Sequence, residues 1–484
     1  MTPLSLLPLA LAAGGGRVDQ YETQQLVAAG LTLLQRCAPL VRALQGRRAA
    51  VLLPTSPAYV TAIAACEGRG AVLVNPLAAP TEVAYQLDDA NVGAVFTSTA
   101  LAARLPDGTP TVLLDDAPRR ARVLAGGRTT DVDLGAHFGL ALAGEADPPG
   151  RDEEAAIVYT SAMAGRALAA VLTHRNLLAN GRSCVIAAGN VAEDHVLALL
   201  PFSHLFGLTV TATSPLLAGA RVTTMERFHP MRAVDVLERE GITEVVGVPA
   251  VFGALVAVLE RRRARLASDR LRLCICGGAV LPESMQDRWF DLTGVELRQG
   301  YGLTEAGPVC LFNRVDLPNR RGALGVPFPG VGVTIRRPLA GPPAAGAEPY
   351  PELPRGEPGE ICVRGDNVGP GYLRDGHLGL PRHGAWLGTG DLGAMDADGV
   401  VRFLGVLKPM FTRNGFNVYP RELERVVGEL PGVRRVRVRA IPEPAREHDI
   451  GLDVEGAVTE AEVRAWCERH LSAYKQPSEV TVAA

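Results

Sequence analysis

The stretch from Tyr159 to His174 has the outline of a phosphate-binding turn, in which a strand leads through a short loop into a helix. A loop that cradles phosphates uses glycines, so that backbone N–H groups can approach the oxygens, and a lysine as a point charge. Here the middle reads Ser161-Ala-Met-Ala-Gly-Arg-Ala-Leu-Ala169, with one glycine and no lysine. The whole chain has only two lysines, Lys408 and Lys475. This turn is therefore predicted to lack the groups that hold a polyphosphate.

The bulk composition is that of an ordinary globular protein. The 484 residues are 47% hydrophobic and 21% charged, which is enough material for more than one core. A net charge of −3 gives no basic field for nucleic acid or an anionic membrane. The eight cysteines show neither metal-ligand nor disulfide-framework spacing, and no apolar run is long enough to span a bilayer. The composition predicts a cytoplasmic protein with no metal site and no nucleic-acid or membrane partner.

Short apolar strands alternate with helices early in the chain. Strands are expected at 48–54, 71–75 and 93–97, and helices at 57–69 and 80–89. Such alternation is typical of a doubly wound, largely parallel α/β sheet. Residues 139–153 have the composition of a linker, and residues 338–359 that of a surface loop.

The same pattern predicts two domains of unequal size. Residues 1–405 are expected to form a large N-terminal domain of doubly wound sheets with a small β-subdomain. Residues 406–484 are expected to form a small, shortened and mobile α+β C-terminal domain.

Five motifs in order resemble the adenylate-forming (ANL) superfamily, in its acyl-CoA ligase branch, over nearly the whole chain. They are Leu200-Pro-Phe-Ser-His-Leu-Phe-Gly207, Gly277-Gly-Ala-Val-Leu281, Tyr301-Gly-Leu-Thr-Glu305, Thr389-Gly-Asp391 and Asn414-Gly-Phe-Asn-Val-Tyr-Pro-Arg-Glu-Leu-Glu424. The resemblance implies the ANL fold. It also implies a reaction in two halves: an acid and ATP form an acyl-AMP, then a small C-terminal domain swings and the acyl group passes to a thiol.

The resemblance places the AMP moiety against three of these motifs. Asp391 follows a tight Thr-Gly turn and is expected to accept the ribose hydroxyls, since a carboxylate only accepts hydrogen bonds; a turn-capping aspartate is the alternative. Tyr301 would hold adenine with its aromatic face; the alternative is that Tyr301 only packs in the core. Thr304 would contact the phosphate, and Glu305 would hold Mg²⁺ near ATP in the family. The backbone expected to face the adenine with Tyr301 belongs to Gly277, Gly278, Ala279, Gly300 and Gly302.

Two further residues concern the acyl group and the thiol. His204 stands where the family places a residue beside the acyl carbonyl, and an imidazole there can orient the carbonyl or shape the thiol's approach. A lone histidine is otherwise more often structural. Gly415 falls where the family's C-terminal domain lines the pantetheine tunnel of CoA; a plain turn glycine is the alternative. Residues 246–253 and the region of Phe206 and Gly207 are expected to line the acyl pocket.

Three departures from the family all concern ATP. Leu168 takes the place of the lysine in the phosphate loop, and Arg166 occupies a variable position. The hinge motif Gly-Arg-x-x-Asp becomes Gly405-Val-Leu-Lys-Pro409, so Val406 replaces the nucleotide-binding arginine and Pro409 the hinge aspartate. The tail runs only seven residues past Tyr474-Lys-Gln-Pro477, short of the family's Gly-Lys.

The pattern of loss favours a ligase that keeps only thioesterification. Each lost donor to developing charge costs on the order of 10²–10³ in rate. The second half-reaction asks chiefly for proximity and orientation. The predicted reaction is acyl-AMP + CoA → acyl-CoA + AMP, with no ATP or Mg²⁺ and with a separate adenylating enzyme upstream. It resembles the division of labour in bacterial diterpenoid antibiotic pathways.

Two alternatives stay open. The first is a full ATP-dependent acyl-CoA synthetase with an atypical phosphate loop. The second is an inactive homologue that binds an acyl-adenylate or a partner enzyme as a scaffold. A carrier protein in place of CoA as the thiol acceptor also remains open.

Overall fold

The computed structural model describes residues 6–483 except 67–69, 116, 136–149, 161–166, 339–350, 374–379, 381, 408–409 and 444–445. The middle of the predicted phosphate turn, most of the expected linker and much of the expected surface loop therefore lie outside the described residues. So do Lys408 and Pro409 of the hinge motif.

The first sheet has nine strands and a parallel centre. Its strand order is β20-β10-β9-β4-β3-β5-β6-β7-β8. The parallel strands are β3 (Arg48–Leu52), β4 (Ala71–Leu73), β5 (Val92–Thr97), β6 (Thr111–Leu113) and β9 (Glu154–Thr160). Antiparallel strands complete its edges, namely β7 (Arg120–Ala125), β8 (Arg128–Asp133), β10 (Leu168–Thr173) and β20 (Gly371–Leu373). The strands expected near residues 48, 71 and 93 are confirmed.

The second sheet also has nine strands, in the order β17-β16-β15-β14-β13-β11-β12-β1-β2. Its parallel strands are β1 (Arg17–Val18), β11 (His195–Ala198), β12 (Arg221–Thr224), β13 (Glu244–Gly247), β14 (Leu273–Cys276) and β15 (Leu297–Gly302). The antiparallel ones are β2 (Tyr21–Glu22), β16 (Val309–Phe312) and β17 (Val326–Pro327). Strands β13 and β14 are buried throughout, as apolar strands covered on both faces must be.

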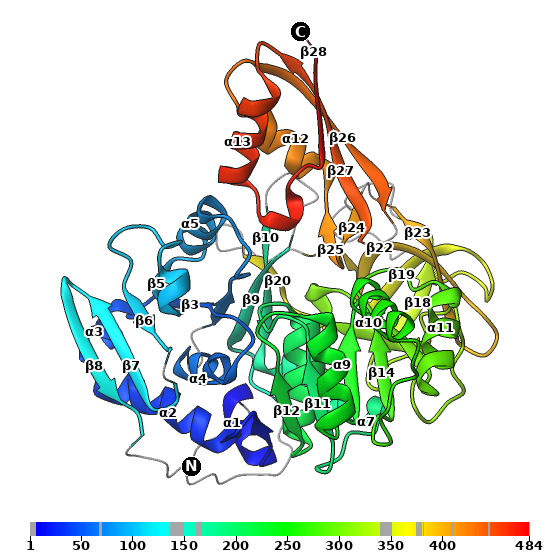
Figure 1. Ribbon diagram of the computed structural model, residues 1–484, viewed down its shortest axis with the longest axis horizontal. Helices are drawn as coiled ribbons and strands as arrows, with labels where there is room; N and C mark the ends of the chain where they lie inside the picture. Colours follow the sequence, from blue (N-terminus) through cyan, green and yellow to red (C-terminus); the bar gives the residue numbers. More distant parts are fainter. Residues whose placement is uncertain are drawn as a thin grey trace.

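Helices connect and cover these strands (Figure 1). They are α1 (Leu7–Gly14), α2 (Thr23–Arg36), α3 (Ala38–Ala43), α4 (Pro57–Cys66), α5 (Pro80–Asp89), α6 (Thr99–Ala102), α7 (His174–Ala188), the π-helix η1 (Phe206–Thr213), α8 (Ser214–Leu217), α9 (Pro230–Arg239), α10 (Pro249–Arg262), α11 (Glu283–Thr293) and η2 (Thr304–Ala306). Nearly every residue of α4 is buried, because this helix packs against both α2 and β3. No helix among the described residues is long and apolar enough to cross a bilayer.

A smaller sheet and a separate C-terminal part complete the molecule. The smaller sheet contains β18 (Gly332–Arg336), β19 (Gly359–Arg364), β21 (Arg382–His383), β22 (Trp386–Met395) and β23 (Val401–Val406). The C-terminal part contains β24 (Phe411–Arg413), β25 (Phe416–Val418), α12 (Pro420–Gly428), β26 (Val433–Glu443), β27 (Glu447–Gly456), α13 (Glu460–His470), η3 (Ala473–Lys475) and β28 (Glu479–Ala483).

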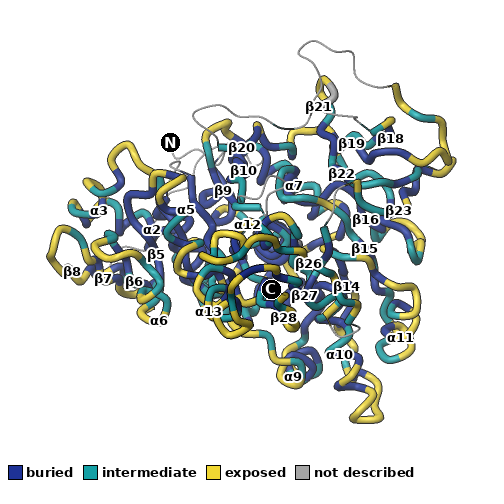
Figure 2. Tube along the Cα trace, turned by 90° about the horizontal axis from the view of Figure 1, so that it is seen from above, coloured by how far each residue is buried: buried dark blue, intermediate teal, exposed yellow. Residues whose placement is uncertain are grey.

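This C-terminal part has its own hydrophobic core, in which Val418, Leu423 and Leu452 are fully buried. Seen from above, α12, α13 and the strands β26–β28 cover the middle of the molecule (Figure 2). The boundary between residues 405 and 406 stays a prediction, and β23 runs through it to Val406.

Candidate active site

A cavity of about 980 Å³ lies where the two large sheets and the C-terminal part meet. All ten residues predicted to act at the site line it: His204, Gly277, Gly278, Ala279, Gly300, Tyr301, Gly302, Thr304, Asp391 and Gly415. The structure thus brings together residues that stand more than 200 positions apart in the sequence. Their individual roles remain predictions.

Tyr301 and Asp391 form one polar pair in the wall. The Tyr301 hydroxyl, from β15, donates a hydrogen bond of 2.7 Å to Oδ2 of Asp391 in β22. Burial and the nearby Asp391 carboxylate raise the pKa of Tyr301 well above its usual value, so the hydroxyl keeps its proton. A carboxylate has about four acceptor sites, so Asp391 can accept from Tyr301 and still accept from a ribose.

The glycines of the site differ in what requires them. A Cβ on Gly302 would stand 1.9 Å from the carbonyl oxygen of Pro308, so the packing of the following loop alone demands glycine there. A Cβ on Gly277 would stand 3.0 Å from the Gly300 carbonyl oxygen and 3.1 Å from Phe206. The ends of β14 and β15 therefore approach closely, and bare backbone faces the cavity between them.

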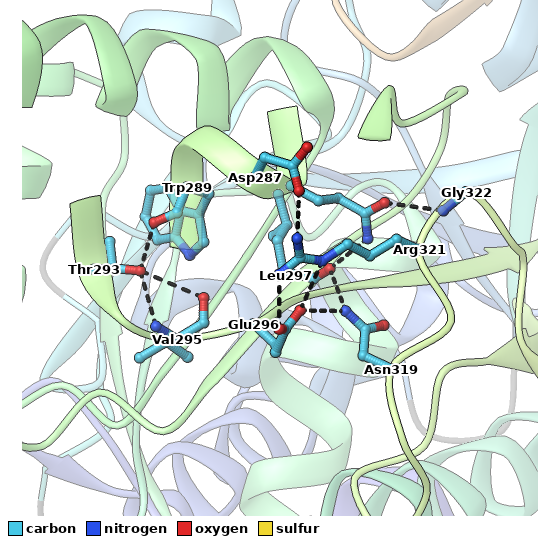
Figure 3. A network of polar contacts seen from close by, with 10 residues as sticks. Asp287, Trp289, Thr293, Val295, Glu296, Leu297, Asn319, Arg321 and Gly322 are labelled. Carbon is cyan, nitrogen blue, oxygen red and sulfur yellow. Dashed lines mark hydrogen bonds and ion pairs between the residues drawn. The ribbon is translucent and has the colours of Figure 1, made fainter. Parts of the chain in front are cut away.

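A polar network fixes the start of β15, the strand that carries Tyr301. Figure 3 shows Arg321 joined to both Asp287 of α11 and Glu296, and Asn319 also reaching Glu296. Arg321 Nη2 lies 2.8 Å from Glu296 Oε1, and Asn319 Nδ2 donates to Oε2 at 2.7 Å. These contacts fix the chain at Glu296, immediately before β15 and six residues before the strand ends at Gly302.

His204 is neutral and presents a defined tautomer. The Phe206 N–H donates a hydrogen bond of 3.1 Å to Nδ1 of His204, so the proton of the neutral ring resides on Nε2. Burial lowers the pKa of His204 to about 4. At neutral pH the ring therefore offers one N–H donor to the cavity, which suits the holding of a carbonyl oxygen and not the acceptance of a proton.

The Gly415 turn is docked against the N-terminal part. Its φ of 75° lies in the left-handed region. A Cβ at this position would stand 2.5 Å from Cγ1 of Val248, and the Gly415 carbonyl oxygen lies 3.7 Å from the Cβ position of Gly278. Glu447 Oε2 accepts a hydrogen bond of 3.0 Å from the Gly415 N–H. Any side chain at Gly415 would push the turn away from the cavity.

Sequence reasoning did not find Val248 or Glu447 in these roles. Val248 belongs to the segment expected to line the acyl pocket, yet it packs against the C-terminal part. Glu447 itself has a positive φ of 64°, a conformation that no motif in the sequence predicts.

Lys475 joins the C-terminal part to the first sheet's helices. Its Nζ lies 2.7 Å from Glu422 Oε1 of α12 and 3.0 Å from Glu82 Oε1 of α5. Although burial lowers it, Tyr474, Glu422 and Glu82 together raise the pKa of Lys475 well above its usual value, so the ammonium stays charged. The Thr81 hydroxyl also donates to the Arg469 carbonyl at 3.1 Å. One of the chain's two lysines thus holds the two parts together.

The cavity wall is poor in free positive charge. Among the described residues its carboxylates are Glu82, Glu305, Asp391, Glu422 and Glu429, and its Lys and Arg side chains are Arg425 and Lys475. Arg425 pairs with Glu429 at 2.5 Å, and Lys475 with two glutamates. Two of the positions that depart from the family pattern are described, and both contribute apolar side chains: Leu168 and Val406 line the cavity, and Val406 lies opposite Asp391 in the register of β22 and β23.

Thr304 and Glu305 lie beside each other in η2. Thr304 lines the cavity, as expected of a residue that contacts a nucleotide phosphate. The Glu305 carboxylate accepts a hydrogen bond from the Tyr372 hydroxyl of β20, which ties η2 to the first sheet. No group of three His, Cys, Asp or Glu side chains in the described part of the chain is arranged to hold a metal ion.

Known proteins resemble this chain over most of its length. The profile of the family described as AMP-binding enzyme matches residues 35–373. A feruloyl-CoA synthase from an Amycolatopsis species is 32% identical over 455 residues, covering 90% of this chain and 84% of the relative. A long-chain-fatty-acid–CoA ligase from Bacillus subtilis is 28% identical over 479 residues, covering 90% and 81%.

Solved structures share the fold. A malonyl-CoA ligase, solved as a ternary product complex with methylmalonyl-CoA and AMP, has a TM-score of 0.78 at 26% identity and covers 99% of this chain and 98% of its own. An amide bond synthetase from Marinactinospora thermotolerans has a TM-score of 0.78 at 24% identity, with coverage of 99% and 95%. The predicted fold, a large α/β N-terminal domain with a small C-terminal domain, is confirmed.

Proposed function

The chain belongs to the AMP-binding enzyme family, in its acyl-CoA ligase branch, and we propose that it forms acyl-CoA from a preformed acyl-adenylate and CoA. The observation that carries this proposal is the charge of the cavity wall. In the described wall the Arg and Lys side chains are both paired with glutamates. Leu168 and Val406 stand where the resemblance to the family implies a lysine and an arginine.

This charge distribution suits one half-reaction better than the other. Adenylation requires positive groups that hold a triphosphate and stabilise the departing pyrophosphate, and such preorganised groups contribute about 10²–10³ each in rate. An acyl-adenylate carries a single phosphate charge and is already activated. Thioesterification then needs mainly a nucleotide site, a held carbonyl and an approach for the thiol.

The geometry supplies each of these parts. Asp391, Tyr301 and the bare backbone at Gly277 and Gly300 suit the AMP moiety. The Nε2–H of His204 suits the acyl carbonyl, and the docked Gly415 turn presents backbone alone to the cavity, which suits the approach of a slender thiol. In the reaction the CoA thiol loses its proton to solvent, sulfur bonds to the acyl carbon, and the carbon–oxygen bond to phosphate breaks, so that AMP leaves. A separate ATP-dependent enzyme must then supply the acyl-adenylate.

The second candidate is the complete ATP-dependent reaction. The comparisons favour it, because the relatives that cover 90% of the chain are a feruloyl-CoA synthase and a long-chain-fatty-acid–CoA ligase. In that case Arg166 and other arginines would replace the missing lysines.

The test uses the purified full-length protein and two probe acyl groups suggested by these relatives, feruloyl and dodecanoyl. Each acyl-AMP is incubated with CoA, and each free acid with ATP, Mg²⁺ and CoA. We expect acyl-CoA and AMP from at least one acyl-adenylate and no pyrophosphate from either acid. Pyrophosphate release would establish the complete reaction. If neither adenylate gives acyl-CoA, the remaining hypothesis is an inactive homologue that acts as a scaffold.

A matched pair of variants separates catalysis from spontaneous thiolysis of the adenylate. Asp391→Asn is expected to lower kcat/KM for the acyl-adenylate by at least tenfold. Asp398→Asn, at an exposed aspartate that pairs with Arg320, is expected to leave it unchanged. Equal rates for both variants would contradict the assigned nucleotide site.

A further inference from the structure

The cavity continues past His204 and Phe206 into an apolar region. Its walls there come from α7, η1, the end of β16 and the residue after β17, and they are made of Cys184, Ala187, Ala188, Val210, Phe312 and Phe328. This lining suits the hydrocarbon body of an acyl group. η1 is a π-helix, a conformation frequent at functional sites.

Two polar side chains interrupt this apolar lining. Asn190 and Ser214 both line the cavity and are only 7% and 1% exposed. The left-handed Gly189 ends α7 immediately before Asn190, and Ser214 is the first residue of α8. Both polar groups are therefore fixed by helix ends and not by mobile loops.

These side chains form a chain of hydrogen bonds that ends at Glu244. The Ser214 hydroxyl donates to Oδ1 of Asn190 at 2.7 Å, and Nδ2 of Asn190 donates to Oε2 of Glu244 at 2.7 Å. Burial raises the pKa of Glu244 to about 7, although the bond from Asn190 lowers it. Burying three polar side chains in an apolar region is unfavourable unless their hydrogen-bonding capacity is used.

The register of the second sheet locates this group relative to the nucleotide. Glu244 begins β13 and pairs with Leu273 at the start of β14, whereas Gly277 follows the end of β14. Leu273 and Gly277 are four residues apart, which corresponds to about 13 Å along the strand at roughly 3.3 Å per residue. Asn190 and Ser214 thus lie at the end of the cavity remote from the nucleotide.

The hydrogen-bonding capacity that Asn190 and Ser214 still have defines which ligand group they can recognise. Nδ2 of Asn190 has a second N–H, and the Ser214 oxygen and Oδ1 of Asn190 each have a lone pair beyond the bonds described. A hydroxyl both donates and accepts, so it matches this combination, whereas a keto oxygen uses only the N–H.

We propose that Asn190 and Ser214 form a subsite for a hydroxyl group at the end of the acyl chain remote from the reacting carbonyl. This inference rests on the proposed acyl-adenylate function and names the class of its substrate: an acyl group with an apolar body and a distal hydroxyl.

The test measures binding and turnover with matched pairs of ligands that differ by one hydroxyl. The pairs are 4-hydroxycinnamoyl and cinnamoyl, and 10-hydroxydecanoyl and decanoyl. Each acyl group is presented as a stable sulfamoyl-adenosine analogue for calorimetry and as the adenylate for turnover with CoA. We expect at least one hydroxylated member to bind at least tenfold more tightly than its partner.

Variants attribute this preference to the subsite. Ser214→Ala and Asn190→Leu are expected to bring the ratio of affinities close to one. Val210→Ala, an apolar wall residue, is expected to weaken both members of a pair alike and to leave the ratio unchanged. If Asn190→Leu does not fold, Ser214→Ala alone must still lower the ratio at least threefold.

The outcomes separate the two proposals. A hydroxyl preference in binding without acyl-CoA formation would refute thioesterification and retain the subsite. Acyl-CoA formation with equal affinities in both pairs, or a preference that Ser214→Ala does not change, would overturn the subsite. Binding of neither member of either pair would also count against it.

Discussion

In the proposed function His204 holds the acyl carbonyl through a single N–H donor, and a pair of variants tests this role. His204→Ala removes the donor and is expected to lower the thioesterification rate by about 10²-fold, as for other preorganised donors to an acyl oxygen. His204→Gln keeps an N–H donor in a neutral side chain and is expected to retain more activity. The measurement is kcat for a fixed acyl-adenylate at saturating CoA.

The pH dependence distinguishes a donor from a proton acceptor. Because the pKa of His204 is lowered to about 4, the ring stays neutral at every pH above about 5. The wild type and His204→Gln should therefore show pH–rate profiles of the same shape between pH 5.5 and 8. An inflection near pH 6.5 that only the wild type shows would contradict the donor role and favour proton transfer.

At the scale of elements, the Gly415 turn is sensitive to the addition of a single methyl group. Gly415→Ala places a Cβ against Val248 and is expected to lower the thioesterification rate by more than tenfold. Gly399→Ala is the matched control, because Gly399 also has a positive φ, 81°, yet its Cβ would meet nothing within 4 Å. Both variants are expected to lose about 1–2 kcal/mol of stability from the left-handed backbone, and Gly415→Ala more because of its contact with Val248. Only the first should lose activity, and equal activities would show that the docked turn is not required.

The elements themselves were largely predictable, whereas their contacts were not. Local apolar periodicity predicted β3, β4, β5, α4 and α5 within a few residues, since it depends only on neighbours in the chain. The motifs predicted ten site residues, and all ten line the cavity, together with many that the motifs did not predict. The bonds from Asn190 to Glu244 and from Lys475 to Glu82 join residues 54 and 393 positions apart. Such pairs depend on strand order and domain placement, which periodicity does not encode.

At the scale of the whole molecule, the ion pair between Lys475 and Glu82 holds the C-terminal part over the cavity. Glu82→Gln keeps the shape of α5 but removes one of the two negative partners of a buried ammonium. Breaking one partner of a buried pair is strongly destabilising, by about 3–5 kcal/mol in fully buried cases. We therefore expect faster proteolytic separation of the C-terminal part from the rest of the chain and a lower rate of thioesterification.

The control is Glu468→Gln, at an exposed glutamate on α13 of the same C-terminal part. It changes the net charge equally but removes no contact between the two parts, so cleavage should proceed as in the wild type. If Glu82→Gln and Glu468→Gln are cleaved at the same rate, the ion pair does not restrain the C-terminal part.

The two partners of Lys475 belong to different bodies, and this affects the cost of opening. Glu422 lies on α12, in the same part as Lys475, so the predicted swing of the C-terminal part would carry both residues together and leave Glu82 behind on α5. Such a swing would leave Lys475 paired with Glu422, so the ammonium would keep one counter-ion within the C-terminal part. Water would replace the lost contact both at the Lys475 ammonium and at the Glu82 carboxylate. Opening would therefore exchange one ionic contact for hydration and leave the charge pair inside the C-terminal part intact.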